Sequence, residues 1–86
     1  MNINKLIAIV KTKLANKISI EKINIEDKSF LHKNHIGNQK NKFHLKLIVH
    51  SKELKEMSKI ESNKKIYKIL NDEMRDHIHS IQILIN

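Results

Sequence analysis

The stretch from Phe43 to His50, with the sequence FHLKLIVH, constrains the fold more than any other part of the chain. Apolar side chains recur at every second residue, which is the period of a β-strand with one buried face. The inward-facing residues of this strand are then Phe43, Leu45, Leu47 and Val49. His44 and His50 fall on the opposite face, and we expect both on the surface. A chain of 86 residues has room for one modest hydrophobic core, so the strand belongs to a single domain spanning residues 1–86.

Two further segments have the same period of two. Isoleucines alternate with polar residues within 18–26, where Glu21 and Lys22 interrupt the pattern, so the strand begins either at Ile18 or at Lys22. The polar segment 27–42 has no periodicity, so the strands on either side of it are expected to form an antiparallel hairpin. A last strand is predicted over His77–Ile85. One of its faces carries Ile78, Ser80, Gln82 and Leu84, and the other carries His79, Ile81, Ile83 and Ile85.

In most of the remaining sequence the apolar residues have the spacing of amphipathic helices. Apolar residues at i, i+3, i+4 and i+7 predict a helix from Asn2 to about Lys17, capped by Asn2 or Asn4. Ser51 is the predicted N-cap of a second helix. The short apolar stripe of that helix consists of Leu54, Met57 and Ile60.

A third helix is predicted after a break at Ser62 or Asn63, either of which is a suitable cap, and it ends near Arg75. The elements therefore follow the order α-β-β-α-α-β. This order predicts a small domain of the α+β class, in which the helices pack on one face of a three-stranded sheet.

The net charge of +8 at pH 7 has two interpretations. A basic surface favours nucleic acid or an acidic partner. The alternative is compositional, because lysine, isoleucine and asparagine are abundant throughout and the lysines are spread along the chain. Arg75 is the only arginine among the 17 basic residues, although arginine is the residue best suited to bidentate recognition of phosphates and bases. The charge alone therefore supports at most a non-specific, salt-sensitive interaction with DNA.

The sequence contains no cysteine, which excludes disulfides and also a thiolate metal site built by this chain alone. Such a composition fits a reducing compartment. No stretch approaches the roughly 20 consecutive apolar residues that a membrane-spanning helix needs. We expect a cytoplasmic protein that has no membrane partner and is a monomer by itself.

Glycine is nearly absent, because Gly37 is the only one in the chain. The Gly-rich phosphate-binding loops of nucleotide-dependent enzymes are therefore excluded, and no nucleophile motif is present, so we expect no enzymatic activity. The GXXG loop with which KH domains clamp RNA is excluded for the same reason. The three aromatic residues Phe30, Phe43 and Tyr67 are too few for a base-stacking platform.

The six histidines are the residues best able to carry chemistry. His32 and His35 lie in the polar segment 27–42 at the spacing i, i+3, and His79 lies near the C-terminus. Neutral imidazole binds iron, zinc and copper, and we expect these three residues to form one site. The alternatives are that the loop histidines are ordinary solvated residues and that His79, on one strand face with Ile81, is partly buried and hydrogen-bonded. Two loop histidines without further ligands make a poor zinc site.

The histidine segment, DKSFLHKNHIG followed by FHLKLIVHS, resembles the signature of the BolA family. That signature has an acidic residue, a serine, a histidine, often a second histidine three residues later, a glycine and then a histidine-containing strand. KKIYKILNDEM and DHIHSIQI resemble the family's last helix and final strand. The resemblance covers about Ile23 to Ile85. It implies an α-β-β-α-α-β fold related to type II KH domains, in agreement with the periodicity.

The resemblance further implies a heterodimer with a monothiol glutaredoxin that shares a [2Fe–2S] cluster with this chain. His79 would be one cluster ligand and His32 the second, with His35 as the back-up. His44 matches a strand histidine of the family that has no settled role. The partner supplies the thiolates, so no cluster is expected in the isolated chain. Imidazole must be neutral to bind metal, so mild acid should release the cluster. The implied function is cluster assembly, trafficking or iron regulation.

The alternative function is that of a KH-like, nucleic-acid-binding transcriptional regulator, with Lys64, Lys65 and Lys68 as candidate contacts. Two departures from the family pattern bear on this alternative. The family's Arg-His-Arg-like triplet is Ser62-Asn63-Lys64 here, and its Phe-x-Gly is Leu54-Lys55-Glu56. The family uses these positions for contacts with partners or nucleic acid, so the resemblance carries those contacts over only weakly.

Overall fold

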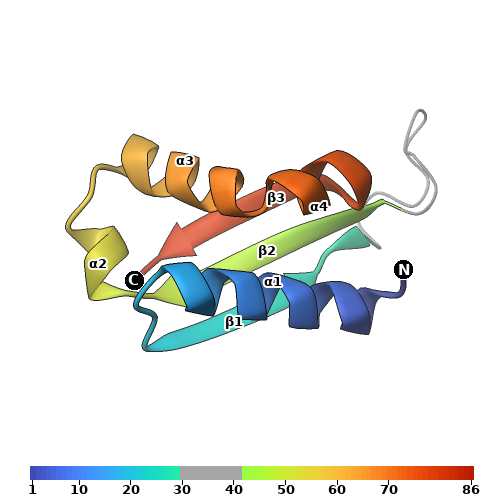
Figure 1. Cartoon of the computed structure of the whole chain (residues 1–86), viewed down its shortest axis with the longest axis horizontal. Helices are drawn as coiled ribbons and strands as arrows, with labels where there is room; N and C mark the ends of the chain where they lie inside the picture. The colour runs from blue at the N-terminus through green and yellow to red at the C-terminus, as the bar shows by residue number, and fades with distance from the viewer. Residues whose placement is uncertain (30–41) are drawn as a thin grey trace.

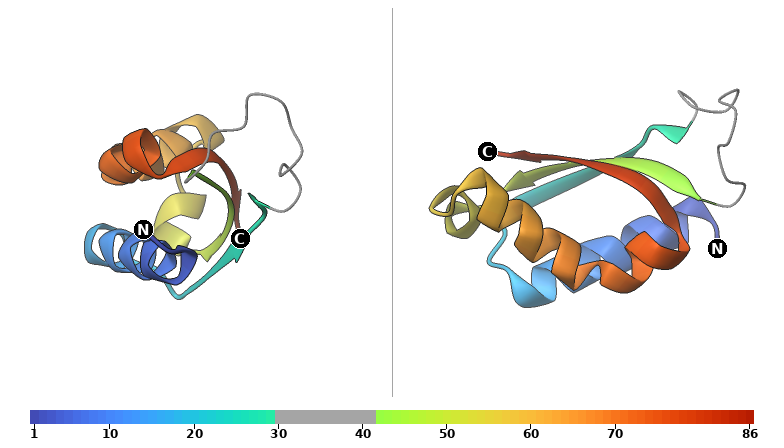
Figure 2. Two further views of the ribbon diagram at one scale, coloured as in Figure 1. Left: turned by 90° about the vertical axis from the view of Figure 1, so that its right-hand side faces the viewer. Right: turned by 90° about the horizontal axis from the view of Figure 1, so that it is seen from above.

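In the computed structural model, which describes residues 1–29 and 42–86, four helices pack on one face of a three-stranded sheet (Figure 1; Figure 2). The elements are α1 (Ile3–Lys17), β1 (Lys22–Asp27), β2 (Phe43–His50), α2 (Lys52–Lys55), α3 (Lys59–Ile69), α4 (Asn71–Asp76) and β3 (Ile78–Ile85). The predicted α+β class is confirmed. In the part of the chain that the structure describes, no helix covers the second face of the sheet, and no helix is long and apolar enough to cross a membrane.

The central strand of the sheet is β2, with β1 and β3 on either side. β1 pairs with β2 in the antiparallel sense, which confirms the predicted hairpin. β3 pairs with β2 in the parallel sense, because helices α2, α3 and α4 return the chain to the end of the sheet where β2 begins. β2 and β3 therefore start at the same end of the sheet, and β1 finishes there.

The hydrophobic core lies between the helices and one face of this sheet. Leu47, for example, has Ile25 of β1 and Ile83 of β3 as its neighbours in register, so apolar side chains form a continuous row across the three strands. The helices complete the core with residues that are at most 1% exposed, namely Leu6, Val10, Leu14, Leu54, Ile66 and Leu70. The alternating pattern of FHLKLIVH is thus confirmed for Leu45, Leu47 and Val49, which are at most 2% exposed.

The predicted caps are right for the first two helices, but the predicted extents of the second and third helices are wrong. α2 ends at Lys55 and does not continue to Ile60, and the predicted third helix is divided into α3 and α4. Asn2 caps α1 by accepting a hydrogen bond from the Lys5 amide, and Ser51 caps α2 by accepting one from the Leu54 amide. α3, however, is capped by Ser58 rather than by Ser62 or Asn63. Ser62 is buried within α3, where its hydroxyl donates to the Lys59 carbonyl, a bond that lets serine occupy a helix interior.

The structure decides two smaller predictions about isoleucines, of which the one for Ile60 was wrong. Ile60, assigned to a buried stripe, is 69% exposed, because α3 begins at Lys59 and turns this residue away from the core. Ile18 is buried but ends α1 rather than starting a strand, so β1 has the later of its two predicted beginnings, at Lys22.

A bulge in β3 changes the predicted faces of that strand. Phe43 pairs with Ile78, but the next residue, His44, pairs with Ser80, so His79 is an extra residue in the ladder. Ile78 is consequently 1% exposed and belongs to the core, not to the open face. His79 is exposed and does not share the face of Ile81. Strict alternation cannot predict this, because an unpaired residue shifts the phase of everything before it.

Hydrogen bonds around Ser19, just after the C-terminal end of α1, join α1, α2 and α3. The Ser51 hydroxyl donates to the Ser19 carbonyl over 2.7 Å, and Glu53 Oε1 accepts from the Ser19 amide over 3.0 Å. Lys65 Nζ lies 2.7 Å from Glu53 Oε2. The hydrogen bond from Lys65, followed by that from the Ser19 amide, lowers the pKa of Glu53 below its ordinary value of 4.5.

Glu53→Gln should therefore remove a pH-dependent part of the stability. Because the folded-state pKa of Glu53 is lowered, its contribution is complete above 4.5 and is lost as the pH falls through the folded-state value. The difference in the free energy of unfolding between wild type and Glu53→Gln should be largest near neutral pH and should close in acid. Urea denaturation at a series of pH values measures it. Glu56→Gln, at an exposed position next to α2, is the control and should produce no comparable difference.

Candidate functional site

The ends of three chain segments meet at the edge of the sheet where β2 and β3 begin. The amide of Lys28, just after β1, donates to the His44 carbonyl over 2.7 Å, and the His44 amide donates to Ser29 Oγ over 3.1 Å. The Phe43 amide donates to the His77 carbonyl, which holds the start of β3 beside the start of β2. The first two residues of β2, Phe43 and His44, are therefore bonded both to the chain just after β1 and to the start of β3.

The bulge in β3 brings two consecutive side chains against His44. Ser80 Oγ lies 2.6 Å from His44 Nδ1, and the rings of His44 and His79 have centroids 4.8 Å apart with planes tilted by 53°. In a regular strand His79 and Ser80 would point to opposite faces of the sheet. The additional residue lets both approach the same neighbour, and this is the usual way in which a bulge redirects a side chain.

His44 and His79 differ sharply in their exposure. His44 is 5% exposed, which corrects the prediction that it lies on the surface, whereas His79 is exposed. The reason is tertiary: the alternation correctly turns His44 away from the helices, but the bulged strand then covers it. The bond to Ser80 fixes the orientation of the buried ring. His44 is thus suited to positioning the ring of His79, and His79 is the imidazole that another molecule can reach.

The open face beside these histidines is basic and hollowed. A pocket of about 380 Å³ is lined by His44, Ser80, Gln82, Lys28 and Lys46, among others. Lys28 Nζ is 2.8 Å from Glu26 Oε1. The hydrogen bond from Lys28, assisted by its charge, lowers the pKa of the Glu26 carboxyl. Lys28 is thus paired with Glu26 at the edge of this pocket.

The other predicted ligands, His32 and His35, lie outside the described residues. The segment that contains them is joined to this end of the sheet, since Ser29 accepts the hydrogen bond of the His44 amide.

A metal could be held here only with help from outside the described residues. Residues 1–29 and 42–86 contain no group of three or more histidine or acidic side chains that could hold a metal ion. One exposed imidazole, His79, supplies a single ligand. A metal centre shared with a partner that brings the remaining ligands would be compatible with this single donor, and any thiolates would have to come from the partner, because the chain contains no cysteine.

The lysines proposed to contact nucleic acid lie on α3 but have different surroundings. Lys64 and Lys68 are exposed at the spacing i, i+4 and so share one side of the helix. Lys65 is half-buried and paired with Glu53, so its charge is largely occupied within the fold. Two of the three lysines are thus available to an anionic partner.

Comparison with known proteins identifies the family. The model of a family described as BolA-like protein matches residues 14–86. The chain belongs to the BolA-like family. The DNA-binding transcriptional regulator BolA of Haemophilus influenzae is 27% identical over 75 residues, which cover 87% of this chain and 70% of that protein.

Solved structures of BolA-like proteins share the fold. The BolA domain of SufE1 from Arabidopsis thaliana has a TM-score of 0.78 at 23% identity and covers 92% of this chain and 87% of its own. BolA1 from Arabidopsis thaliana has a TM-score of 0.75 at 22% identity with the same coverage. These similarities confirm the BolA-like architecture predicted from the histidine-containing segments.

Neither the contact of Ser80 with His44 nor the buried position of His44 was predicted from the sequence. Neither has a local signal, because a serine and a histidine on the polar face of their strands look like ordinary surface residues. Only the register of β2 and β3, with its bulge, places the Ser80 hydroxyl against the His44 ring.

Ser80→Ala tests the positioning role of this hydrogen bond. Removing the hydroxyl leaves His44 Nδ1 without this partner at a site that is 5% exposed, and we expect the free energy of unfolding to fall by about 1–2 kcal/mol. The ring proton resonances of His79 should also shift, since His44 would no longer be held against it. Chemical denaturation and NMR measure the two effects. Gln82→Ala, two residues further along the exposed side of β3, should leave the His79 resonances unchanged.

Proposed function

We propose that this BolA-like chain pairs with a monothiol glutaredoxin and co-ligates a [2Fe–2S] cluster through His79 and His32, in the assembly or trafficking of iron–sulfur clusters or in iron regulation. The observation that carries the proposal is the exposed imidazole of His79 on the bulge of β3. A side chain that ligates a cluster shared between two proteins must be accessible to the partner protein. His79 meets this requirement and His44 does not.

The surroundings of His79 support the proposed role. The contact with the His44 ring, which is itself bonded to Ser80, restricts the orientation of His79 before any partner arrives. Residues behind a metal ligand commonly set its orientation and affinity. When bound, the cluster would supply electron transfer or iron–sulfur cargo, and the chain itself would supply neutral imidazole ligands. The histidine-containing segment 30–41 joins the fold at Ser29, next to His44.

The experiment is a titration of this chain into a monothiol glutaredoxin that carries its cluster. Visible absorption and circular dichroism should change to a new cluster spectrum that saturates at one chain per glutaredoxin, because imidazole ligands perturb the cluster. A spectrum that stays the same while the proteins associate would reject shared ligation. It would leave the simpler function of an interaction domain that binds glutaredoxin without a cluster.

DNA binding is a second candidate, favoured by the name of the Haemophilus influenzae relative and by the exposed pair Lys64 and Lys68. Fluorescence anisotropy with a labelled DNA duplex at several salt concentrations tests it. If the two lysines contact phosphates, Lys64→Glu with Lys68→Glu should reduce the salt-dependence exponent by about 2. An unchanged exponent would exclude them as contacts. Lys5→Glu with Lys11→Glu, at exposed positions on α1, is a matched control for the change in net charge.

A further inference from the structure

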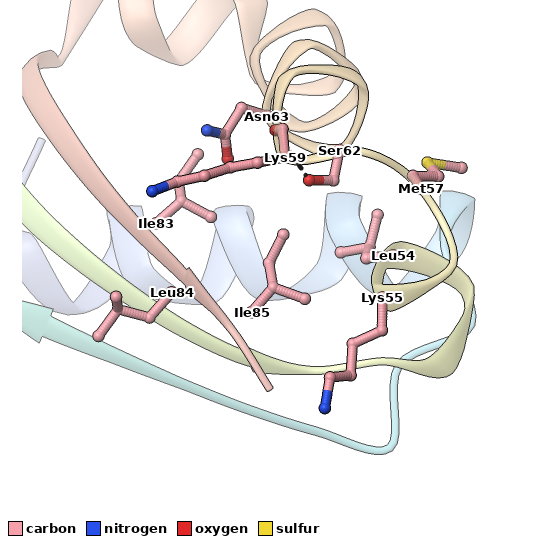
Figure 3. Close-up of a pocket in the computed structure, with 9 residues that line it drawn as sticks. All are labelled: Leu54, Lys55, Met57, Lys59, Ser62, Asn63, Ile83, Leu84 and Ile85. Atoms are coloured by element: carbon pink, nitrogen blue, oxygen red, sulfur yellow. Dashed lines mark hydrogen bonds between the residues drawn. The ribbon is translucent and has the colours of Figure 1, made fainter.

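A groove lies at the opposite end of β3, far from His79. It has a volume of about 350 Å³ and runs between the last part of β3 and the helices α2 and α3 (Figure 3). Its apolar wall includes Leu54, Met57 and Ile85. Ile85 is the sixth residue after His79, which is about 20 Å further along a strand. The groove and the histidine site are therefore separate surfaces.

The backbone of β3 presents unpaired groups to this groove. Asn86 donates to the Val49 carbonyl and accepts from the Ser51 amide, so its backbone faces β2. Backbone direction alternates along a strand, and Ile83 and Ile85 must then face away from β2, toward α3. The position of Ile81 agrees, because its carbonyl accepts a bond of 3.5 Å from the Tyr67 hydroxyl of α3. Within residues 1–29 and 42–86, Tyr67 is the residue whose side chain bonds to this edge, and it does so at Ile81.

An edge of this kind can accept another strand. Exposed edges with free amide and carbonyl groups pair readily with extended chains. In proteins that bind peptides by adding a strand to a sheet, pockets beside the edge recognise alternate side chains of the added segment. Leu84, next to the two edge-facing residues, is 40% exposed and adds apolar surface. A strand edge alongside a helix thus provides both elements of a peptide-binding groove.

The charge of the groove indicates which segment it would accept. Lys55 and Lys59 are exposed, line the groove, and form no salt bridge among the described residues (Figure 3). Lys59 is also the first residue of α3, whose dipole is positive at that end. A second copy of this chain is disfavoured as the occupant, because each copy carries a net charge of +8.

We propose that this groove binds an extended acidic segment of a partner protein, which adds to the edge of β3 beyond Tyr67 and places its carboxylates near Lys55 and Lys59. The segment would form backbone hydrogen bonds with Ile83 and Ile85 and become a fourth strand of the sheet. This interaction does not depend on a cluster or on His79. A partner held at the histidine end and a segment held in the groove can occupy the chain together.

The test uses a capped nonapeptide of alternating valine and glutamate, with an alternating valine–lysine peptide as its matched control. NMR titration of the labelled full chain should show saturable shifts at Ile83 and Ile85 with the acidic peptide only. Hydrogen exchange should slow at these two amides and remain unchanged at Gln82 and Leu84, which already face β2. Two further acidic peptides carry N-methyl groups on the valines or on the glutamates. Alternate backbone amides of an added strand point toward β3, and the others point away from it. Binding should therefore be lost for only one of these two N-methylated peptides, the one whose methyl groups block the amides that face β3.

Charge variants complete the test without disturbing the core. Lys55→Glu with Lys59→Glu should weaken the acidic peptide about tenfold and admit the valine–lysine peptide. Lys64→Glu with Lys68→Glu, on the same helix but outside the groove, makes the same change in net charge and should have little effect. No shift at Ile83 and Ile85 at about 1 mM peptide would overturn the proposal. So would equal binding of both peptides, or concentration-dependent dimers that protect these amides without peptide.

Discussion

His79→Ala is expected to abolish the new cluster spectrum that forms when this chain is added to a cluster-bearing monothiol glutaredoxin. Alanine removes the exposed imidazole at the bulge of β3, and the ring that it contacts, that of His44, is only 5% exposed. Visible circular dichroism measures the loss. Pairing of the two proteins without a cluster, followed by calorimetry, should remain largely intact, because one side chain among many interface contacts is removed.

Two further variants sharpen this result. His79→Cys should retain a cluster with an altered spectrum, because a thiolate can replace the imidazole as an iron ligand. His50→Ala removes a histidine from the opposite end of β2 and should leave the spectrum as in wild type. His32→Ala should weaken the cluster if that residue is the second ligand. Loss of pairing without a cluster in His79→Ala would contradict its assignment as a ligand and would make it a general contact residue.

Leu47→Ala is expected to have the largest effect on stability. Leu47 is 0% exposed in the middle of the central strand and lies between Ile25 and Ile83 in register. Truncation to alanine removes buried methyl groups and leaves a cavity, which costs about 2–5 kcal/mol for buried leucine. Domains of this size have total stabilities of about 5–15 kcal/mol, so a large share of the folded population is at risk. Urea denaturation followed by far-ultraviolet circular dichroism measures the change.

Ile48→Ala is the matched control for this substitution. Ile48 is the next residue of β2 and belongs to the face of the sheet that no helix covers in the described structure, where it is only partly buried. Its truncation should lower the free energy of unfolding by less than half as much as that of Leu47. The reason is that folding removes less apolar surface from water at Ile48. Equal losses for the two variants would show that the helix-covered face does not dominate the stability of the sheet.

The periodicity of the sequence was sufficient for the fold and for most of the core. A strand with a period of two and a helix with an apolar stripe each have one apolar face to bury. A chain this short can pack such faces against one another in few ways. The histidine-containing segments then indicated the BolA-like family, which the family model confirms over residues 14–86. His79 was placed among the candidate ligands from sequence; the structure shows it exposed, and its role as a ligand stays a prediction. The roles of His32 and His35 remain predictions.

The tertiary structure alone decided what surrounds His79. One extra residue in β3 moves Ile78 into the core and brings His79 and Ser80 together against His44, which becomes buried. The groove between β3 and the helices, with Lys55 and Lys59 in its lining, likewise exists only after α2 and α3 have packed next to the strand. Local periodicity reports which face of an element is apolar. The register between strands that are distant in sequence depends on packing across the whole domain, so the pairing of side chains at both ends of β3 had no signal in the sequence.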